Sequence, residues 1–99
     1  MELLTQKLRE KFPPIYSGEN KNPEEVEVVA KFFTPFSNWT WYATEFDGVD
    51  LFFGYVQGLE NELGYFSLCE LESIEGPAGL KIERDLYFSG TLADVMTKI

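Results

Sequence analysis

Carboxylates are the only abundant side chains in this sequence that could carry out catalysis. Glu45, Asp47 and Asp50 surround a predicted hairpin turn, and Glu60 and Glu62 occupy the next turn. Carboxylates this close together can act as an acid–base pair or hold a divalent cation. Their spacing matches no calcium-binding loop, and turns commonly carry Asp and Glu for solubility and local hydrogen bonding. A small carboxylate- or metal-dependent enzyme using Glu45, Asp47 or Asp50 is therefore the alternative hypothesis.

Other catalytic groups are scarce. The sequence contains no histidine, which removes the commonest general base and metal ligand. The one cysteine, Cys69, therefore has no histidine to activate it, and it lies in a predicted helix beside Leu68 and Leu71. We expect a buried or half-buried structural thiol there. Glycine-rich phosphate loops and serine-nucleophile motifs are also missing. The sequence predicts a protein that is not an enzyme, with no catalytic residue, cofactor or metal site.

Aromatic residues are concentrated in a predicted β-hairpin over residues 38–56 that contains both tryptophans of the chain. An Asp-Gly pair in its turn and flanking β-branched and aromatic residues are typical of such hairpins. These rings could stack on nucleic-acid bases or contact a protein partner, although most aromatic side chains in strands pack in the core. The predicted binding residues are Trp39, Trp41, Tyr42, Glu45, Asp47 and Tyr55.

Side chains along the first hairpin strand alternate between the two faces of the sheet. This alternation predicts that Glu45 shares a face with Trp39 and Trp41, whereas Phe46 shares the other face with Tyr42. Neither face is clearly polar. Either both faces are covered, or one face presents aromatic side chains to a partner.

The remaining pattern predicts an α+β fold with a mainly antiparallel sheet of about four to five strands. An N-terminal helix, a short helix near 67–75 and a C-terminal helix accompany the sheet, all within a single domain over residues 1–99. Ser67 with Glu70, and Thr91 with Asp94, have the spacing of helix-capping pairs. Arg84 falls on the apolar side of the last strand, where we expect a carboxylate partner or a place at the rim. The predicted helices and strands are Leu3–Lys11, Val26–Thr34, the hairpin, Gly64–Phe66, Ser67–Ile74, Leu80–Phe88 and a helix from Thr91.

The charge restricts the possible partners. Seventeen acidic and 8 basic residues give a net charge of -9, which argues against binding to nucleic-acid phosphates. The run of Glu60, Glu62, Glu70, Glu72 and Glu75 is either a solvated surface or a mimic of DNA phosphates that blocks a DNA-binding protein. No apolar run is long enough for a membrane span and no secretion signal is visible. A single thiol also suits a reducing compartment, so we expect a soluble cytoplasmic protein.

Several segments are similar to those of a known family, namely 31–35, 37–48, 52–54, 62–68, 70–72 and 82–88, with weaker likeness at 3–5 and 13–16. On these segments, most of the chain resembles the family catalogued as domain of unknown function 2958. The resemblance implies a bacterial or phage origin, often on plasmids and other mobile elements, and it assigns no catalytic or binding residue.

Together these features favour a small acidic protein of a bacterial mobile element that acts as a non-enzymatic protein-interaction module. An inhibitor or DNA mimic acting on a nucleic-acid-binding protein is one form of this hypothesis. We expect a protein partner rather than nucleic acid or a membrane, and a homodimer stays open.

Overall fold

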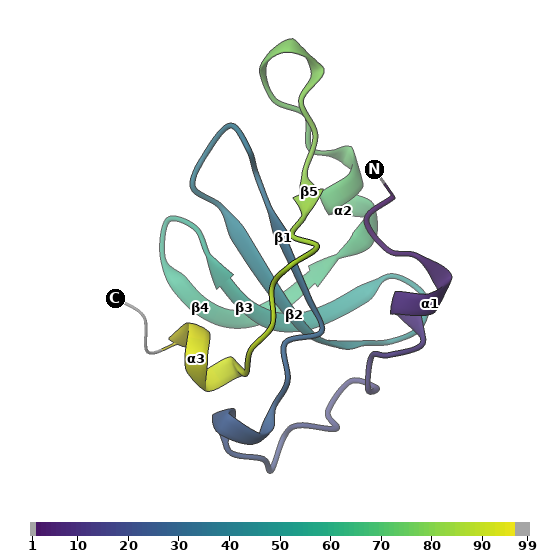
Figure 1. Ribbon diagram of the computed structural model, residues 1–99, viewed down its shortest axis with the longest axis vertical. Helices are drawn as coiled ribbons and strands as arrows, with labels where there is room; N and C mark the ends of the chain where they lie inside the picture. Colours follow the sequence, from purple (N-terminus) through teal and green to yellow (C-terminus); the bar gives the residue numbers. More distant parts are fainter. Residues whose placement is uncertain (1, 97–99) are drawn as a thin grey trace.

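The predicted hairpin forms the centre of an antiparallel sheet in the computed structural model, which describes residues 2–96. The strand order is β4-β3-β2-β1-β5, so four consecutive strands form a meander and the last strand returns beside the first (Figure 1). This confirms the α+β class with an antiparallel sheet. The strands are β1 (Ala30–Phe33), β2 (Thr40–Phe46), β3 (Leu51–Gln57), β4 (Asn61–Ser67) and β5 (Glu83–Arg84).

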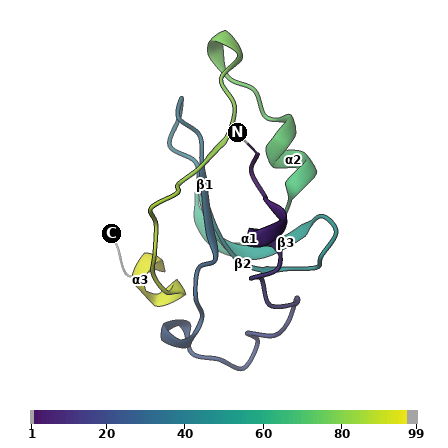
Figure 2. The same ribbon diagram turned by 45° about the vertical axis from the view of Figure 1, so that its right-hand side comes forward.

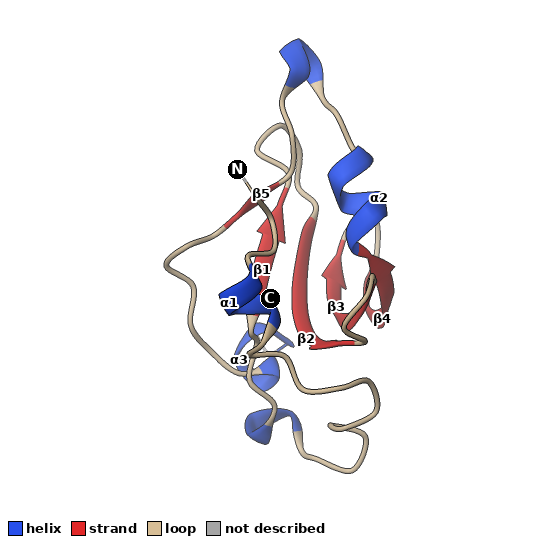
Figure 3. Cartoon of the chain, turned by 90° about the vertical axis from the view of Figure 1, so that its right-hand side faces the viewer, coloured by secondary structure: helices blue, strands red, loops and turns tan. Residues whose placement is uncertain are grey.

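Short helices lie on both sides of the sheet (Figure 2). They are α1 (Gln6–Arg9), α2 (Leu68–Ser73) and α3 (Leu92–Met96), with two 3₁₀ turns, η1 (Pro23–Glu25) and η2 (Pro77–Gly79). Helix α2 follows β4 directly (Figure 3). Its first turn is capped by Ser67, whose Oγ accepts a hydrogen bond from the Glu70 N–H at 2.9 Å. Thr91 and Asp94 cap α3 reciprocally, so both capping predictions are confirmed.

The sheet carries two hydrophobic clusters, one packed against each of its faces. The Phe52 face packs under α1, α2 and the N-terminal segment, and it contains Phe32, Trp41, Phe46, Phe66 and Leu71 among its buried side chains. The Tyr42 face packs under α3, and its buried members are Val28, Tyr42, Tyr55, Leu92 and Val95. Both faces therefore carry a buried apolar cluster, which explains why neither face is polar in the sequence.

A β-bulge in β2 places Glu45 and Phe46 on the faces opposite to those predicted. The pairing with β3 shifts register between Ala43 and Glu45, so two residues of β2 take the place of one. The extra residue reverses the alternation beyond it. Phe46 consequently packs with Phe52 on the Phe52 face, whereas Glu45 lies opposite Phe53 and lines a pocket with it. The prediction that Glu45 shares a face with Trp41, and Phe46 with Tyr42, was wrong.

Several predicted elements are shorter or placed differently. The N-terminal helix begins later than predicted, at Gln6, because Thr5 caps its first turn. Leu3 and Leu4 precede the helix and are buried. The predicted strand from Val26 reduces to β1, since Val28 donates its N–H to the Gly90 carbonyl oxygen instead of the sheet. The short strand predicted at Gly64–Phe66 begins earlier, at Asn61.

The predicted strand Leu80–Phe88 contracts most, to the two residues of β5. Of its predicted apolar side, Ile82 is buried, whereas Leu80 and Leu86 are exposed. Arg84 lies on β5, the edge strand of the sheet, which agrees with the expected place at the rim. It donates hydrogen bonds to the carbonyl oxygens of Glu2 at 3.1 Å and Leu3 at 2.6 Å. Cys69 is exposed, which corrects the prediction of a buried or half-buried thiol, because it lies on the solvent side of α2.

Candidate functional site

The three carboxylates of the predicted hairpin turn do not converge. Glu45 is buried on the Tyr42 face, where Oε1 accepts a hydrogen bond from the Tyr16 N–H at 2.8 Å and Oε2 accepts one from the Gly18 N–H at 3.0 Å. Asp50 Oδ1 accepts a hydrogen bond from the Cys69 N–H at 2.8 Å in the first turn of α2. No group of three or more acidic or thiol side chains in residues 2–96 is arranged to hold a metal ion.

Asp47 organises the turn itself. Its Oδ1 accepts hydrogen bonds from the N–H groups of Val49 and Asp50 at 2.8 Å and of Leu51 at 3.0 Å. These three bonds, from Val49 first, then Leu51 and Asp50, lower the pKa of Asp47 below its ordinary value. The carboxylate thus stabilises the turn that joins β2 to β3.

The lowered pKa predicts a pH dependence of stability. Because the folded-state pKa lies below the unfolded-state value, Asp47 contributes stability above the unfolded pKa and loses it as pH falls through the folded pKa. We expect Asp47→Asn to be less stable than the wild type at neutral pH and equal to it in strong acid. Chemical denaturation of both proteins across this range measures the difference, and a gap independent of pH would contradict the assignment.

The four predicted aromatic binding residues divide between the two faces. Trp39 and Trp41 stack on the Phe52 face with ring centroids 5.7 Å apart. Tyr42 and Tyr55 lie on the other face with centroids 6.4 Å apart, and both are buried. Trp39 is 38% exposed, whereas Trp41 is 6% exposed. Of these four rings, Trp39 therefore presents the largest exposed fraction to a partner.

Trp39 forms one side of a groove between the sheet and α2, which we call the Trp39 groove. Its volume is about 260 Å³. Gly58 lies against the Trp39 ring, because a Cβ there would come within 2.3 Å of Trp39 Cζ3. At Gly64, by contrast, a Cβ would meet no atom within 4 Å, so the groove is open above β4. The groove is lined by Trp39, Trp41, Val56, Glu62, Gly64, Tyr65, Phe66, Glu70, Leu71 and Ile74.

Two exposed carboxylates belong to this apolar groove. Glu62 lies on the same row of the sheet as Val56 and Trp41, and Glu70 extends from the first turn of α2. Neither side chain takes part in a salt bridge recorded for the described part of the chain. The groove thus combines an exposed indole with uncompensated negative charge, an arrangement that favours a basic and partly apolar ligand.

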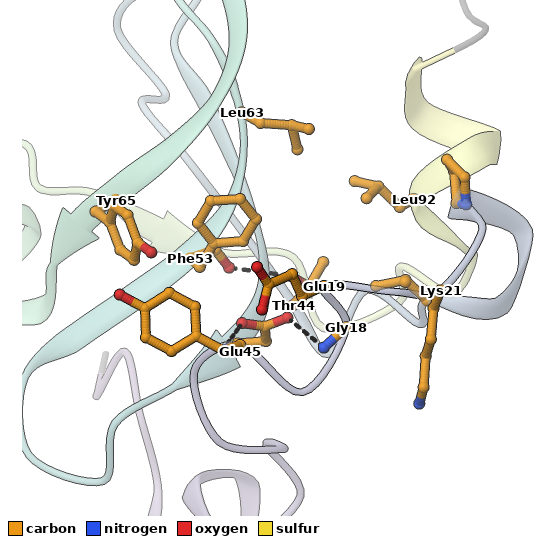
Figure 4. A pocket seen from close by; sticks show the side chains of 12 residues that line it. Gly18, Glu19, Lys21, Thr44, Glu45, Phe53, Leu63, Tyr65 and Leu92 are labelled. Carbon is orange, nitrogen blue, oxygen red and sulfur yellow. Dashed lines mark hydrogen bonds between the residues drawn. The ribbon is translucent and has the colours of Figure 1, made fainter.

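A second hollow lies on the Tyr42 face above Glu45, and we call it the Glu45 pocket. Its volume is about 370 Å³ (Figure 4). Phe53 and Tyr65 form its aromatic wall, with ring centroids 5.0 Å apart and planes at 62°. Tyr16 adopts a positive φ of 74°, and its bond to Glu45 holds it in this uncommon conformation.

Sequence reasoning identified some of these residues and missed others. The alternating aromatic pattern identified the stacked tryptophans, and Glu62 and Glu70 appeared in the acidic run. Their meeting across a groove was not predicted, because β4 begins earlier than expected and carries Glu62 into the sheet. Tyr16 and Gly18 were missed, since no local pattern links a polar loop to a carboxylate 27 or 29 residues away.

Comparison with known proteins gives one match. A family model described as "Protein of unknown function (DUF2958)" matches residues 3–96. No curated protein and no solved structure matches the chain. No helix in residues 2–96 is long and apolar enough to cross a membrane.

Proposed function

Because the chain belongs to the family described as "Protein of unknown function (DUF2958)", which names no activity, we propose a function from its surface: it is a protein-interaction module. The Trp39 groove binds a basic, partly apolar segment of a partner protein. The observation that carries this proposal is the exposed Trp39 ring beside the carboxylates of Glu62 and Glu70, which form no salt bridge recorded within residues 2–96. An origin on a bacterial mobile element is part of the proposal through the family resemblance.

The groove supplies both kinds of contact that such a segment needs. Trp39 provides a large rigid surface for an apolar side chain, and tryptophan is among the residues that contribute most at protein interfaces. Glu62 and Glu70 provide charge for lysine or arginine beside it. The net charge of -9 attracts a basic partner from a distance as well.

The outer edge of strand β4 indicates how the partner segment is oriented. This strand ends the strand order, so its outer edge pairs with no other strand of residues 2–96. An extended segment can add to such an edge through backbone hydrogen bonds and place alternate side chains over Glu62 and Gly64. We therefore propose that the partner binds in an extended conformation along β4.

A short peptide of alternating arginine and leucine tests this proposal. Trp39 fluorescence should change saturably as the peptide binds, and binding should weaken as salt rises. The double variant Glu62→Gln/Glu70→Gln should bind about tenfold more weakly, since partly exposed charge pairs contribute roughly 0.5–1 kcal/mol each.

A matched variant controls for net charge. Glu24→Gln/Glu83→Gln removes the same two charges from exposed positions on η1 and β5, outside the groove lining. It should bind the peptide nearly as tightly as the wild type. If both double variants weakened peptide binding equally, the affinity would depend on the net charge of the protein and not on the groove. This result would contradict a groove site.

DNA mimicry is a narrower form of the same function. Glu60, Glu62, Glu70, Glu72 and Glu75 are all exposed along β4, α2 and the residues beside them, which favours a partner with a basic nucleic-acid-binding surface. Competition with DNA for restriction or CRISPR nucleases tests this form, and failure to displace DNA from a representative panel would remove it. A carboxylate enzyme at Glu45, Asp47 and Asp50 gains no support from their separate hydrogen bonds.

A further inference from the structure

We infer that the Glu45 pocket binds a small organic cation that carries a quaternary or alkylated ammonium group. This site lies on the Tyr42 face, shares only Tyr65 with the lining of the Trp39 groove, and does not depend on the proposed function. Three observations carry the inference: a buried carboxylate that forms no recorded salt bridge within residues 2–96, aromatic walls around it, and an apolar end of suitable size.

Glu45 is the one charged side chain of residues 2–96 that is buried, with 5% of its surface exposed. Its two oxygens each accept one backbone N–H, but the two salt bridges recorded for these residues join other side chains. Lys21 lines the pocket, and Figure 4 shows its ammonium group directed away from Glu45. Both donors are neutral backbone N–H groups, so the negative charge of Glu45 is left for a ligand cation to balance.

Aromatic rings surround the space next to this carboxylate. Phe53 and Tyr65 meet edge to face, and Tyr16 also lines the pocket. Aromatic faces attract cations, and cages of such rings recognise quaternary ammonium groups, whose methyl groups need no hydrogen-bond partner. A compact metal ion would instead require several oxygen ligands in a close shell, and the described residues provide no such group.

The electrostatic environment of the pocket is negative. The pKa of Tyr65 is raised above its ordinary value, first by the neighbouring Tyr16 side chain, then by burial, and further by the nearby charges of Glu45 and Glu19. Glu19 also lines the pocket. Two carboxylates therefore act on the same aromatic wall, and this field favours a cation over a neutral or anionic ligand of the same shape.

The far end of the pocket is apolar. Val26, Leu63 and Leu92 line it, and the volume of about 370 Å³ exceeds what a trimethylammonium group alone would fill. Ligand pockets of this size are commonly apolar with a few polar groups that set orientation. The chemical class is accordingly an ammonium ion with a short aliphatic or aromatic body.

Choline and its neutral isostere 3,3-dimethylbutan-1-ol test the inference, because the two molecules share a shape and differ in charge. Titration followed by amide NMR should give saturable shifts for choline at Gly18, Glu45, Phe53 and Tyr65. The isostere should bind at least tenfold more weakly. Equal binding of the two molecules, or no saturable shift with choline, would overturn the inference.

Variants of the aromatic wall locate the site without disturbing Glu45. Tyr65 is 49% exposed, so its replacement should leave the fold intact. Tyr65→Phe keeps the ring and should retain choline binding, whereas Tyr65→Leu removes the aromatic face and should weaken it about tenfold. If Tyr65→Leu bound choline as tightly as Tyr65→Phe does, a cation site at this wall would be refuted.

Discussion

Gly54→Ala is expected to lower the free energy of unfolding by about 3 kcal/mol or more, the upper range for forcing atoms into a packed interior. A Cβ at Gly54 would lie 1.9 Å from the Tyr42 carbonyl oxygen and 3.0 Å from the Ala43 Cα. Both obstacles are backbone atoms of the paired strand β2, so no side-chain rotation relieves the clash. The strands would have to separate beside the bulge that turns Glu45 toward its pocket.

Gly64→Ala is the matched control for this prediction. Gly64 is the partner of Gly54 across β3 and β4, but a Cβ there meets no atom within 4 Å. Its stability should stay within about 1 kcal/mol of the wild type, since alanine in a strand restricts the unfolded chain more than glycine does. Urea unfolding compares the two variants, and similar losses in both would contradict the close approach at Gly54.

Phe52→Ala is the second variant with a large expected effect, a loss of about 3–5 kcal/mol. The Phe52 side chain is fully buried, with 0% of its surface exposed. Its ring contacts four others: the centroid of Phe46 lies 4.6 Å away, that of Phe66 5.4 Å, and those of Phe12 and Phe32 5.5 Å. Truncation would leave a cavity where β1, β2, β3, β4 and the N-terminal segment meet.

Exposed residues provide the comparison for Phe52. Tyr87 is 93% exposed, so Tyr87→Ala should change the free energy of unfolding by no more than about 0.5 kcal/mol. Thermal or urea unfolding of both variants measures the contrast. If Phe52→Ala lost less than about 1 kcal/mol, the aromatic cluster would not be the centre of the core.

Local chemistry explains why much of the fold could be predicted. The hairpin turn is set by Asp47, whose carboxylate binds three following N–H groups, and helices α2 and α3 start where Ser67 and Thr91 cap them. These signals lie within a few residues of one another, so the sequence contains them directly. The family resemblance is also confirmed, by a match over residues 3–96.

Features that depend on distant contacts could not be predicted. The bulge between Ala43 and Glu45 adds one residue to a strand whose alternation looks regular, and this single step moves Glu45 and Phe46 to the opposite faces. Likewise, Val28 pairs with Gly90 rather than with the sheet, which shortens β1. The Glu45 pocket depends on the bulge, and the Trp39 groove depends on β4 beginning at Asn61. Neither site could therefore be predicted from local patterns.

The most direct test of the interaction function is the affinity of the arginine–leucine peptide for Gly64→Phe. A phenylalanine at this open position of β4 would fill the Trp39 groove while suiting a strand. We expect the variant to keep the wild-type unfolding transition and to bind the peptide at least tenfold more weakly, a difference of about 1.4 kcal/mol. Undiminished binding by the folded variant would show that the groove is not the binding site.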